Sequence, residues 1–237
     1  SVSGGTLLEA NASVNERGGG VDRGARGGSI NLDVIGPSVF STPGLAMYTQ
    51  ALAANLGPLA SSGGNFTGGS IFVSAQSGGS LTAGSIQGYA DARSANVTGT
   101  AGFAQGGSFN VRSITGTIAS TTTGLIFDAS ATGGNGTVGG NGTGGNISLT
   151  ADDGTISAAG SAFSSELRAD GTAGSSTAPA GETRTRGYGG TIDIRTTPAA
   201  NSLFNFDNLT VSASGIGTFD GVFGGDGQGG SVNFEMA

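Results

Sequence analysis

A six-residue block that recurs six times is the feature that most constrains the fold of this chain. The block reads Gly-Gly-[Ser/Thr/Asn]-apolar-x-apolar and starts at Gly27, Gly68, Gly106, Gly144, Gly189 and Gly229. Successive starts are 41, 38, 38, 45 and 40 residues apart. A fixed period in this range is typical of solenoids and arrays, in which each repeat is one structural unit. We therefore expect a stack of similar units, each of about 40 residues.

Each repeat contains short stretches in which apolar and polar residues alternate. Examples are Ile30–Val34, Ile147–Leu149 and Ile192–Ile194. Alternation with a period of two, rich in Ile, Val and Phe, predicts β-strands with one buried face. After this first strand the repeats show a second strand of small residues (79–83, 116–119, 154–158) and a third (125–129, 209–213). A glycine-rich stretch then leads to the next block.

A repeat of this kind cannot bury its apolar face alone, so successive repeats must stack with parallel strands roughly 4.8 Å apart. The sequence therefore predicts an all-β fold, a three-sided parallel β-helix (β-solenoid) with about 40-residue repeats and glycine-rich loops. We favour one coil plus a long loop per repeat over two coils of about 20 residues. The predicted core stack is Ile30, Ile71, Phe109, Ile147, Ile192 and Val232, and its neighbour is Leu32, Val73, Val111, Leu149, Ile194 and Phe234.

One segment carries a helical pattern. In Gly44–Leu59 the apolar residues Leu45, Met47, Tyr48, Leu52 and Leu56 suggest one or two amphipathic turns. This spacing predicts a short amphipathic helix, inserted locally into the solenoid.

The two ends of the chain fall inside repeats. Leu7–Ala12 aligns with the third strand of a repeat, and Ser231–Ala237 is the first strand of another. Neither end has the polar cap that solenoids need for solubility. We therefore expect residues 1–237 to be a single β-solenoid section of a longer array. Open strand edges recruit other chains, so we also expect self-association into a filament.

Composition excludes several classes of function. Glycine accounts for 49 of the 237 residues, but hydrophobic residues reach 35% and the net charge is only -7, which argues against disorder. The chain has no Cys, His, Trp or Lys. It therefore lacks the residues for disulfides, Cys/His zinc sites and Ser-His-Asp catalysis, and the clustered cations for binding nucleic acid. No apolar run approaches the roughly 18 residues of a membrane-spanning helix.

The segments Gly144–Gly160 (GGNISLTADDGTISAAG) and Asn208–Gly217 (NLTVSASGIG) resemble the repeat region of filamentous-haemagglutinin-like exoproteins of bacterial two-partner secretion. The likeness extends from Leu7 to Phe234. It implies a right-handed parallel β-helix, displayed on or released from the bacterial cell surface as an adhesin or filament. It also implies an extracellular location and no catalytic residues.

Calcium is the metal for which the sequence offers candidates. Gly224–Gly230 partly matches a nonapeptide whose carboxylates hold calcium between successive turns, with Asp226 one place early. Asp152 and Asp153 form a second candidate pair in a turn. Turn chemistry also explains Asp at these positions, because Asp tolerates left-handed backbone and bonds to its own main chain. We predict no cofactor and no metal, with these three as the candidate calcium ligands.

A β-helix polysaccharide lyase or hydrolase is the main enzymatic alternative, and hydrolysis would need two carboxylates that face one cleft. Asp152, Asp153, Asp170 and Asp193 are candidates, but the acids are spread over turns and no Lys or His accompanies them. Gly134–Gly139 spells the dinucleotide pattern GxGxxG without a following helix. Thr-x-Thr triplets that could bind ice fall at different places in the repeat. We therefore predict no enzymatic activity, no catalytic residues and no cofactor-binding residues.

These observations favour a structural and adhesive section of a secreted bacterial surface filament, in which β-coils stack into a stiff fibre. The expected partners are other copies and glycans of host or neighbouring cell surfaces. The alternative is a carbohydrate-binding or carbohydrate-modifying β-helix protein. Aromatic ladders would favour the alternative, and their candidates are Phe40, Phe103, Phe163, Phe219 and Phe223. Seven Asn-x-Ser/Thr sequons, at Asn11, Asn65, Asn96, Asn135, Asn141, Asn146 and Asn208, are explained by composition.

Overall fold

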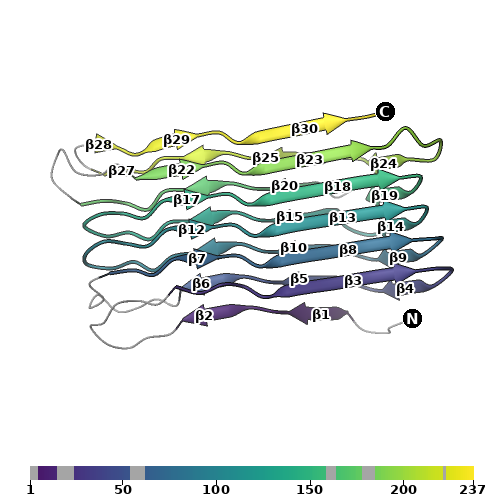
Figure 1. The fold of residues 1–237 in the computed structure, drawn as a ribbon, viewed down its shortest axis with the longest axis horizontal. Helices are drawn as coiled ribbons and strands as arrows, with labels where there is room; N and C mark the ends of the chain where they lie inside the picture. Colours follow the sequence, from purple (N-terminus) through teal and green to yellow (C-terminus); the bar gives the residue numbers. More distant parts are fainter. Residues whose placement is uncertain (1–4, 15–23, 54–61, 159–163, 178–184, 221–222) are drawn as a thin grey trace.

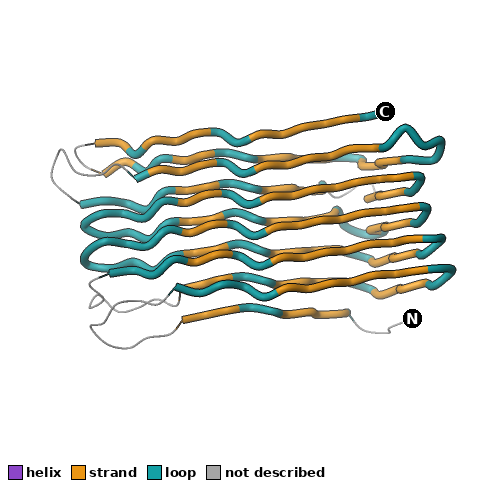
Figure 2. The backbone as a smooth tube through the Cα atoms, in the orientation of Figure 1, coloured by secondary structure: helices purple, strands orange, loops and turns teal. Residues whose placement is uncertain are grey.

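The structure is a computed structural model that describes residues 5–14, 24–53, 62–158, 164–177, 185–220 and 223–237. In this part of the chain every regular element is a β-strand, and the strands stack as a β-solenoid of about 5 turns (Figure 1). Strands and loops recur at the same places in every coil (Figure 2). The all-β, parallel solenoid predicted from the repeat is confirmed.

Each coil passes through five strand positions, which build five parallel sheets numbered here in the order that the chain visits them. The first sheet contains β3 (Ser29–Ile35), β8 (Ser70–Gln76), β13 (Ser108–Ile114), β18 (Asn146–Asp152), β23 (Thr191–Thr196) and β30 (Ser231–Glu235). The second contains β4 (Val39–Thr42), β9 (Ser80–Ala83), β14 (Thr117–Ser120), β19 (Thr155–Ala158) and β24 (Leu203–Phe206). The third contains β1 (Thr6–Glu9), β5 (Leu45–Tyr48), β10 (Ile86–Tyr89), β15 (Leu125–Asp128), β20 (Ser165–Arg168) and β25 (Leu209–Ser212).

Two further sheets have strands of only two or three residues. The fourth contains β2 (Ala12–Val14), β6 (Ala51–Ala53), β11 (Ala92–Arg93), β16 (Ala131–Thr132), β21 (Gly171–Thr172) and β26 (Gly215–Ile216). The fifth contains β7 (Phe66–Thr67), β12 (Ala104–Gln105), β17 (Gly142–Thr143), β22 (Arg186–Tyr188) and β29 (Asp226–Gln228). An antiparallel pair, β27 (Phe219–Asp220) and β28 (Phe223–Gly224), lies apart from them.

The register shows that one repeat makes one coil. In the first sheet Phe109 pairs with Ile71 on one side and with Ile147 on the other, and each step is 38 residues. The alternative of two 20-residue coils is therefore wrong. The glycine-rich stretch is more than a loop, because part of it forms the fourth and fifth sheets.

The coil has two layers. The fifth and first sheets follow each other along one side, which we call the long face, and the second, third and fourth sheets form the return face (Figure 1). The main apolar core lies between the first sheet and the second and third sheets. There the side chain of Phe109 packs against that of Phe127, with ring centroids 5.1 Å apart, in space that Gly88 leaves open.

The core stack named from the sequence lies in register along the first sheet. Ile30, Ile71, Phe109, Ile147 and Ile192 are buried, whereas Val232 is 40% exposed. Val232 lies on β30, the edge strand of its sheet, so no strand of the described chain covers it. Phe234, in the neighbouring stack, is 54% exposed for the same reason.

A second, narrower core lies between the fourth and fifth sheets. It consists of Ala51, Phe66, Ala92, Ala104 and Ala131. Its side chains are mostly methyl groups, because the two layers approach each other more closely here than in the main core.

The two cores are separated by a constriction at the glycine doublets, which we call the waist. The second glycine of each doublet donates its N–H across the coil to a carbonyl of the return face, as from Gly107 to Ala90 (2.7 Å) and from Gly145 to Ala129 (2.8 Å). The same bond occurs in six coils. The other four link Gly28 to Ala10, Gly69 to Thr49, Gly190 to Ala169 and Gly230 to Ala213. Glycine is required at the waist because a side chain would hold the two backbones apart.

The helix predicted at Gly44–Leu59 is wrong. Leu45–Tyr48 is strand β5 and Ala51–Ala53 is strand β6, and residues 54–59 lie outside the described part. Leu45 and Met47 alternate with outward residues and pair in register with Ile86 and Gly88 of the next coil. Ladder pairing and burial in the core therefore outweigh the local helical spacing.

Candidate functional site: a glycine-floored groove

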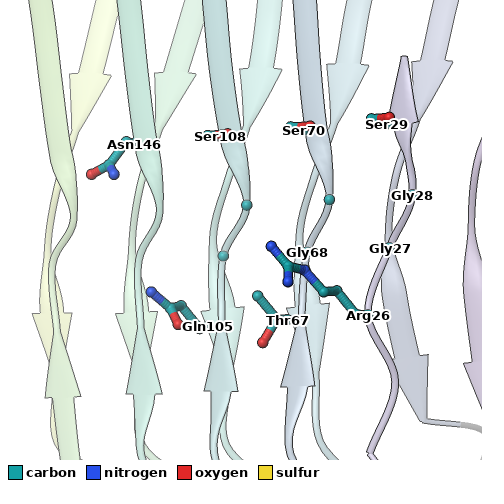
Figure 3. A pocket seen from close by; sticks show the side chains of 13 residues that line it. Arg26, Gly27, Gly28, Ser29, Thr67, Gly68, Ser70, Gln105, Ser108 and Asn146 are labelled. Atoms are coloured by element: carbon teal, nitrogen blue, oxygen red, sulfur yellow. The ribbon is translucent and has the colours of Figure 1, made fainter.

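A groove runs along the outer side of the long face, over the glycine doublets. It crosses four successive coils and has a volume of about 440 Å³ (Figure 3). Glycines 27, 28, 68, 69, 106 and 107 form its floor. One wall carries Arg26, Thr67 and Gln105, and the other carries Ser29, Ser70, Ser108 and Asn146.

A row of backbone carbonyl groups in the floor points toward the groove. In each doublet the second N–H points into the coil, as the bond from Gly69 to Thr49 shows (2.6 Å). In a trans peptide the C=O of the preceding residue points the opposite way. The carbonyl of the first glycine therefore points outward, into the groove. Within the described chain, the carbonyls of Gly27, Gly68 and Gly106 accept no hydrogen bond.

The N–H groups of the floor, in contrast, are already engaged. The first glycine donates to the coil above, as Gly68 does to Gln105 (2.9 Å), and the second donates across the waist. The second carbonyl accepts from the next coil, as Gly69 does from Ser108 (3.0 Å). The floor therefore offers acceptors and no donors.

The walls are ladders of side chains in register. Thr67 pairs with Arg26 below and Gln105 above, and Ser70 pairs with Ser29 and Ser108. The same two rows continue beyond the groove as Thr143, Tyr188 and Gln228, and as Thr191 and Ser231. Among described residues, the side chains of Ser29, Thr67, Ser70, Gln105, Ser108 and Asn146 have no hydrogen-bond partner. They can both donate and accept.

The groove is nearly neutral. Of the residues that line it, Arg26 alone is charged, and no carboxylate is among them. Arg26 lies at the end of the row nearest the N-terminus. Neutral hydroxyl and amide groups therefore dominate the chemistry of this surface.

A second surface feature lies on the return face. The rings of Tyr48 and Tyr89 stack in register, with centroids 5.1 Å apart and planes 11° from parallel. Burial raises the pKa of Tyr89, and the neighbouring Tyr48 and Asp128 raise it further. Burial also raises the pKa of Asp91, whose carboxylate accepts a hydrogen bond from Gln50 Nε2 (2.5 Å). The sequence did not reveal this stack, since Tyr48 was assigned to a helix.

The candidate calcium ligands do not come together. Asp152 is the last residue of β18 and accepts a hydrogen bond from Thr197 (2.7 Å), and Asp153, in the turn that follows, accepts one from Asn201 (2.8 Å). Asp226 lies in the fifth sheet, at the other end of the coil, 3.8 Å from Arg186. Asp153 has a φ of 48°, the left-handed conformation that turn chemistry requires. Among the described residues no group of three or more His, Cys, Asp or Glu side chains could hold a metal ion.

The other candidate carboxylates are also separate. Asp170 is buried on the return face and accepts hydrogen bonds from Ser212 Oγ (2.6 Å) and the N–H of Ser214 (2.7 Å). Asp193 lies on the long face and accepts one from Asn233 (2.7 Å). Each of these carboxylates stabilises the contact between two coils.

The phenylalanines considered for an aromatic ladder do not form one among the described side chains. Phe40 packs against the main core, and Phe103, directly before β12 of the fifth sheet, is 41% exposed. Phe163 lies outside the described residues, as do the side chains of Phe219 and Phe223.

Several asparagines of the sequons join adjacent coils. Asn96 Oδ1 accepts the N–H of Asn135 (2.9 Å), and Asn135 Oδ1 accepts that of Ser175 (2.7 Å). Asn11, Asn65 and Asn141 accept backbone N–H groups in the same way. A role in the fold therefore explains Asn at five of the seven sequons. Gly134–Gly139 lies in the same region and, within the described residues, is followed by no helix.

These features define the class of the protein as a parallel β-solenoid with waisted coils of about 40 residues. Comparisons with models of protein families, with curated proteins and with solved structures gave no match. In the described part of the chain, no helix is long and apolar enough to cross a membrane.

Proposed function

We propose that this chain is a structural and adhesive section of a secreted bacterial surface filament or adhesin, located outside the cell. The observation that carries the proposal is the unbroken register of the ladders. From β3 to β30 the first sheet pairs coil on coil without a bulge or a break. Such a stack resists bending and extension, because its backbone hydrogen bonds run along the axis.

The interior supports the same role. The main core continues through successive coils, so that adding coils lengthens it without widening it. The described coils reach this packing without cysteine and without a group of side chains that could hold a metal ion. A rod of this kind keeps its shape in an extracellular environment, where metal supply and redox conditions vary.

Self-association is part of the proposal. The outer edge of β30 exposes its backbone and the side chains of Val232 and Phe234, which continue the two inward stacks. An exposed edge strand with apolar side chains is a template for another strand. We propose that further coils or other copies of the chain pair there.

Three variants of β30 test this step. Val232→Lys or Phe234→Lys places a charge on the inward side of the edge, whereas Asn233→Lys places it on the outward side of the same strand. We expect the inward charges to abolish association of the purified chain in sedimentation velocity, and the outward charge to leave it intact. Equal association of all three variants would show that the edge of β30 does not mediate the association.

The function itself is tested on native material shed from the cell surface. Cryo-electron microscopy should find filaments with an axial repeat of roughly 4.8 Å that antibodies to this chain decorate. Single, unassembled particles would contradict a structural filament.

The proposal assigns no catalytic reaction to the chain. The candidate carboxylates are spread out: Asp152 ends β18 and Asp193 lies opposite Ser148 on the same sheet, whereas Asp170 lies on the return face. Each is hydrogen-bonded to a neighbouring coil. Glycan binding, the second candidate function, is favoured by the groove of the long face.

A further inference from the structure

We infer that the groove of the long face binds a linear, uncharged polysaccharide that lies along the solenoid axis. The inference rests on the adhesive part of the proposed function and names its site and its class of ligand. A stripe of glycines alone would define no site. The outward carbonyl row and the unpartnered side chains of the two walls give this one its chemistry.

The direction of the ligand follows from the spacing of the acceptors. The floor presents one outward carbonyl per coil, at Gly27, Gly68 and Gly106, and adjacent coils lie about 4.8 Å apart. A polymer along the axis meets the same set of groups at each coil: a floor carbonyl, a Ser or Asn on one wall and an Arg, Thr or Gln on the other. A repeating ligand gains from this repetition, because each further contact is intramolecular.

The chemistry of the ligand follows from what the floor lacks. All the floor N–H groups are used within the protein, so the ligand must supply donors to the carbonyls. It must also accept from the hydroxyl and amide groups of Ser70, Gln105 and Ser108. Sugar hydroxyl groups do both, and they rotate to suit either partner.

An extended peptide fits this surface poorly. Its N–H groups on one side of a strand repeat about every 6.8 Å, two residues at about 3.4 Å, and do not match carbonyls about 4.8 Å apart. Strand addition also requires free N–H groups on the protein to satisfy the peptide carbonyls. The floor has none, since those of Gly68 and Gly69 are both engaged.

A polyanion fits poorly as well. The outward carbonyls present the negative ends of their dipoles along the whole floor, and Arg26 is the single cation of the lining. Anionic polymers need repeated cations. The uncharged walls therefore select a neutral chain.

The probes are soluble neutral polysaccharides of different linkage (a β-1,4-glucan, a β-1,3-glucan, a mannan and dextran), tested against the purified chain by affinity electrophoresis. Heparin serves as the anionic comparison. We expect at least one neutral polymer to retard the chain, and salt to have little effect on the retardation. Failure of all the neutral polymers, or retardation by heparin alone, would overturn the inference.

Three substitutions locate the site. Ser70→Trp fills the groove, and Gln105→Ala removes a donor and an acceptor from its wall. Asn110→Ala is the matched control, because Asn110 is exposed on the same face in the next outward column and does not line the groove. We expect Ser70→Trp to abolish binding, Gln105→Ala to weaken it about 5- to 10-fold, and Asn110→Ala to change it less than about 2-fold.

Equal binding by all three variants would place the ligand elsewhere and refute the inference. The outcome is separable from that of the filament proposal. Chains that form filaments but bind no neutral polymer would contradict this inference alone, and chains that bind the polymer without assembling would contradict the filament alone.

Discussion

The waist can be tested by adding a single methyl group at one glycine. At residue 106, a Cβ atom would overlap the carbonyl oxygen of Ala129 and lie 2.6 Å from the nitrogen of Gly145. Those two atoms form the cross-coil hydrogen bond of the coil above (2.8 Å). Gly106→Ala must therefore break this bond or push the two layers apart.

The cost can be worked from the groups involved. Gly106, Gly145 and Ala129 are all buried, so a broken bond leaves a donor and an acceptor without water. Each orphaned group costs about 1–3 kcal/mol, so we expect Gly106→Ala to lower the free energy of unfolding by about 2–6 kcal/mol. Gly229 occupies the same place in its repeat, but a Cβ there meets nothing within 4 Å. Gly229→Ala should change stability by less than about 0.5 kcal/mol.

The pair is informative because the two substitutions have the same effect on the unfolded chain. Replacing glycine by alanine restricts the unfolded state by a similar amount at either site, and that contribution cancels in the comparison. Urea unfolding followed by circular dichroism gives both values under one set of conditions. Equal stability of the two variants would show that the layers do not touch at the waist, and the outward direction of the floor carbonyls would lose its basis.

Three further predictions test the interior, the first with an exposed residue as its control. Phe127 is fully buried, so Phe127→Ala should lower the free energy of unfolding by about 3–5 kcal/mol in urea. Phe103 is 41% exposed, so Phe103→Ala should lower it by less than about 1 kcal/mol. Similar losses for the two variants would contradict the assigned core. Thr49 Oγ1 is buried without a hydrogen-bond partner among the described residues. Valine keeps the shape of the side chain, so Thr49→Val should raise the thermal midpoint by about 2–4 °C. A lower midpoint would mean that the hydroxyl has a partner. Burial raises the pKa of Asp91 above its ordinary 3.8, so the folded state binds the carboxyl proton more tightly than the unfolded state does. The wild type therefore loses stability as the pH rises from 3.8 through the pKa of the folded state. The stability of Asp91→Asn relative to the wild type should therefore increase as the pH rises above 3.8 in a series of urea melts, and a difference that shrinks with rising pH would refute the assignment.

The sequence contained enough information to predict the first sheet, and the reason is physical. Its strands are five to seven residues long and apolar and polar residues mostly alternate in them, so the strands carry a periodic signal of their own, and the Gly-Gly block marks where each begins. The third strand was also predictable, from the apolar run of Leu125–Asp128 (LIFD) and the alternation of Leu209–Ser212 (LTVS).

The fourth and fifth sheets could not be predicted in the same way. Their strands are mostly two residues long, such as Ala131–Thr132 and Gly142–Thr143, and two residues cannot express a period. They are extended because the coils below and above hold them in register. The error at Leu45–Tyr48 has the same origin, since pairing with Ile86–Tyr89 decides the conformation and is invisible in the local pattern.

The groove could not be predicted from the sequence, because it depends on the direction in which one peptide group of each coil points. Sequence inspection finds the doublets at Gly68 and Gly106 and explains them as turns or sites of close approach. The cross-coil bonds of the structure, such as that from Gly107 to Ala90, reveal that the second N–H points inward and the first carbonyl outward. The wall residues Thr67 and Gln105 carry no pattern of their own until the ladder aligns them.

Packing and recognition make separate demands on the residues around the waist. The glycines are fixed from inside, since any side chain at Gly68 or Gly106 would meet the return face. Because the N–H of the second glycine points into the coil, the carbonyl of the first points outward. Every coil that closes at the waist therefore points the same acceptor away from the core, whatever it binds. The walls are under no such constraint, and their residues differ from coil to coil, from Arg26 through Gln105 to Tyr188. If the groove binds a polymer, the floor provides affinity common to all coils, and the choice between one glycan and another must come from the walls.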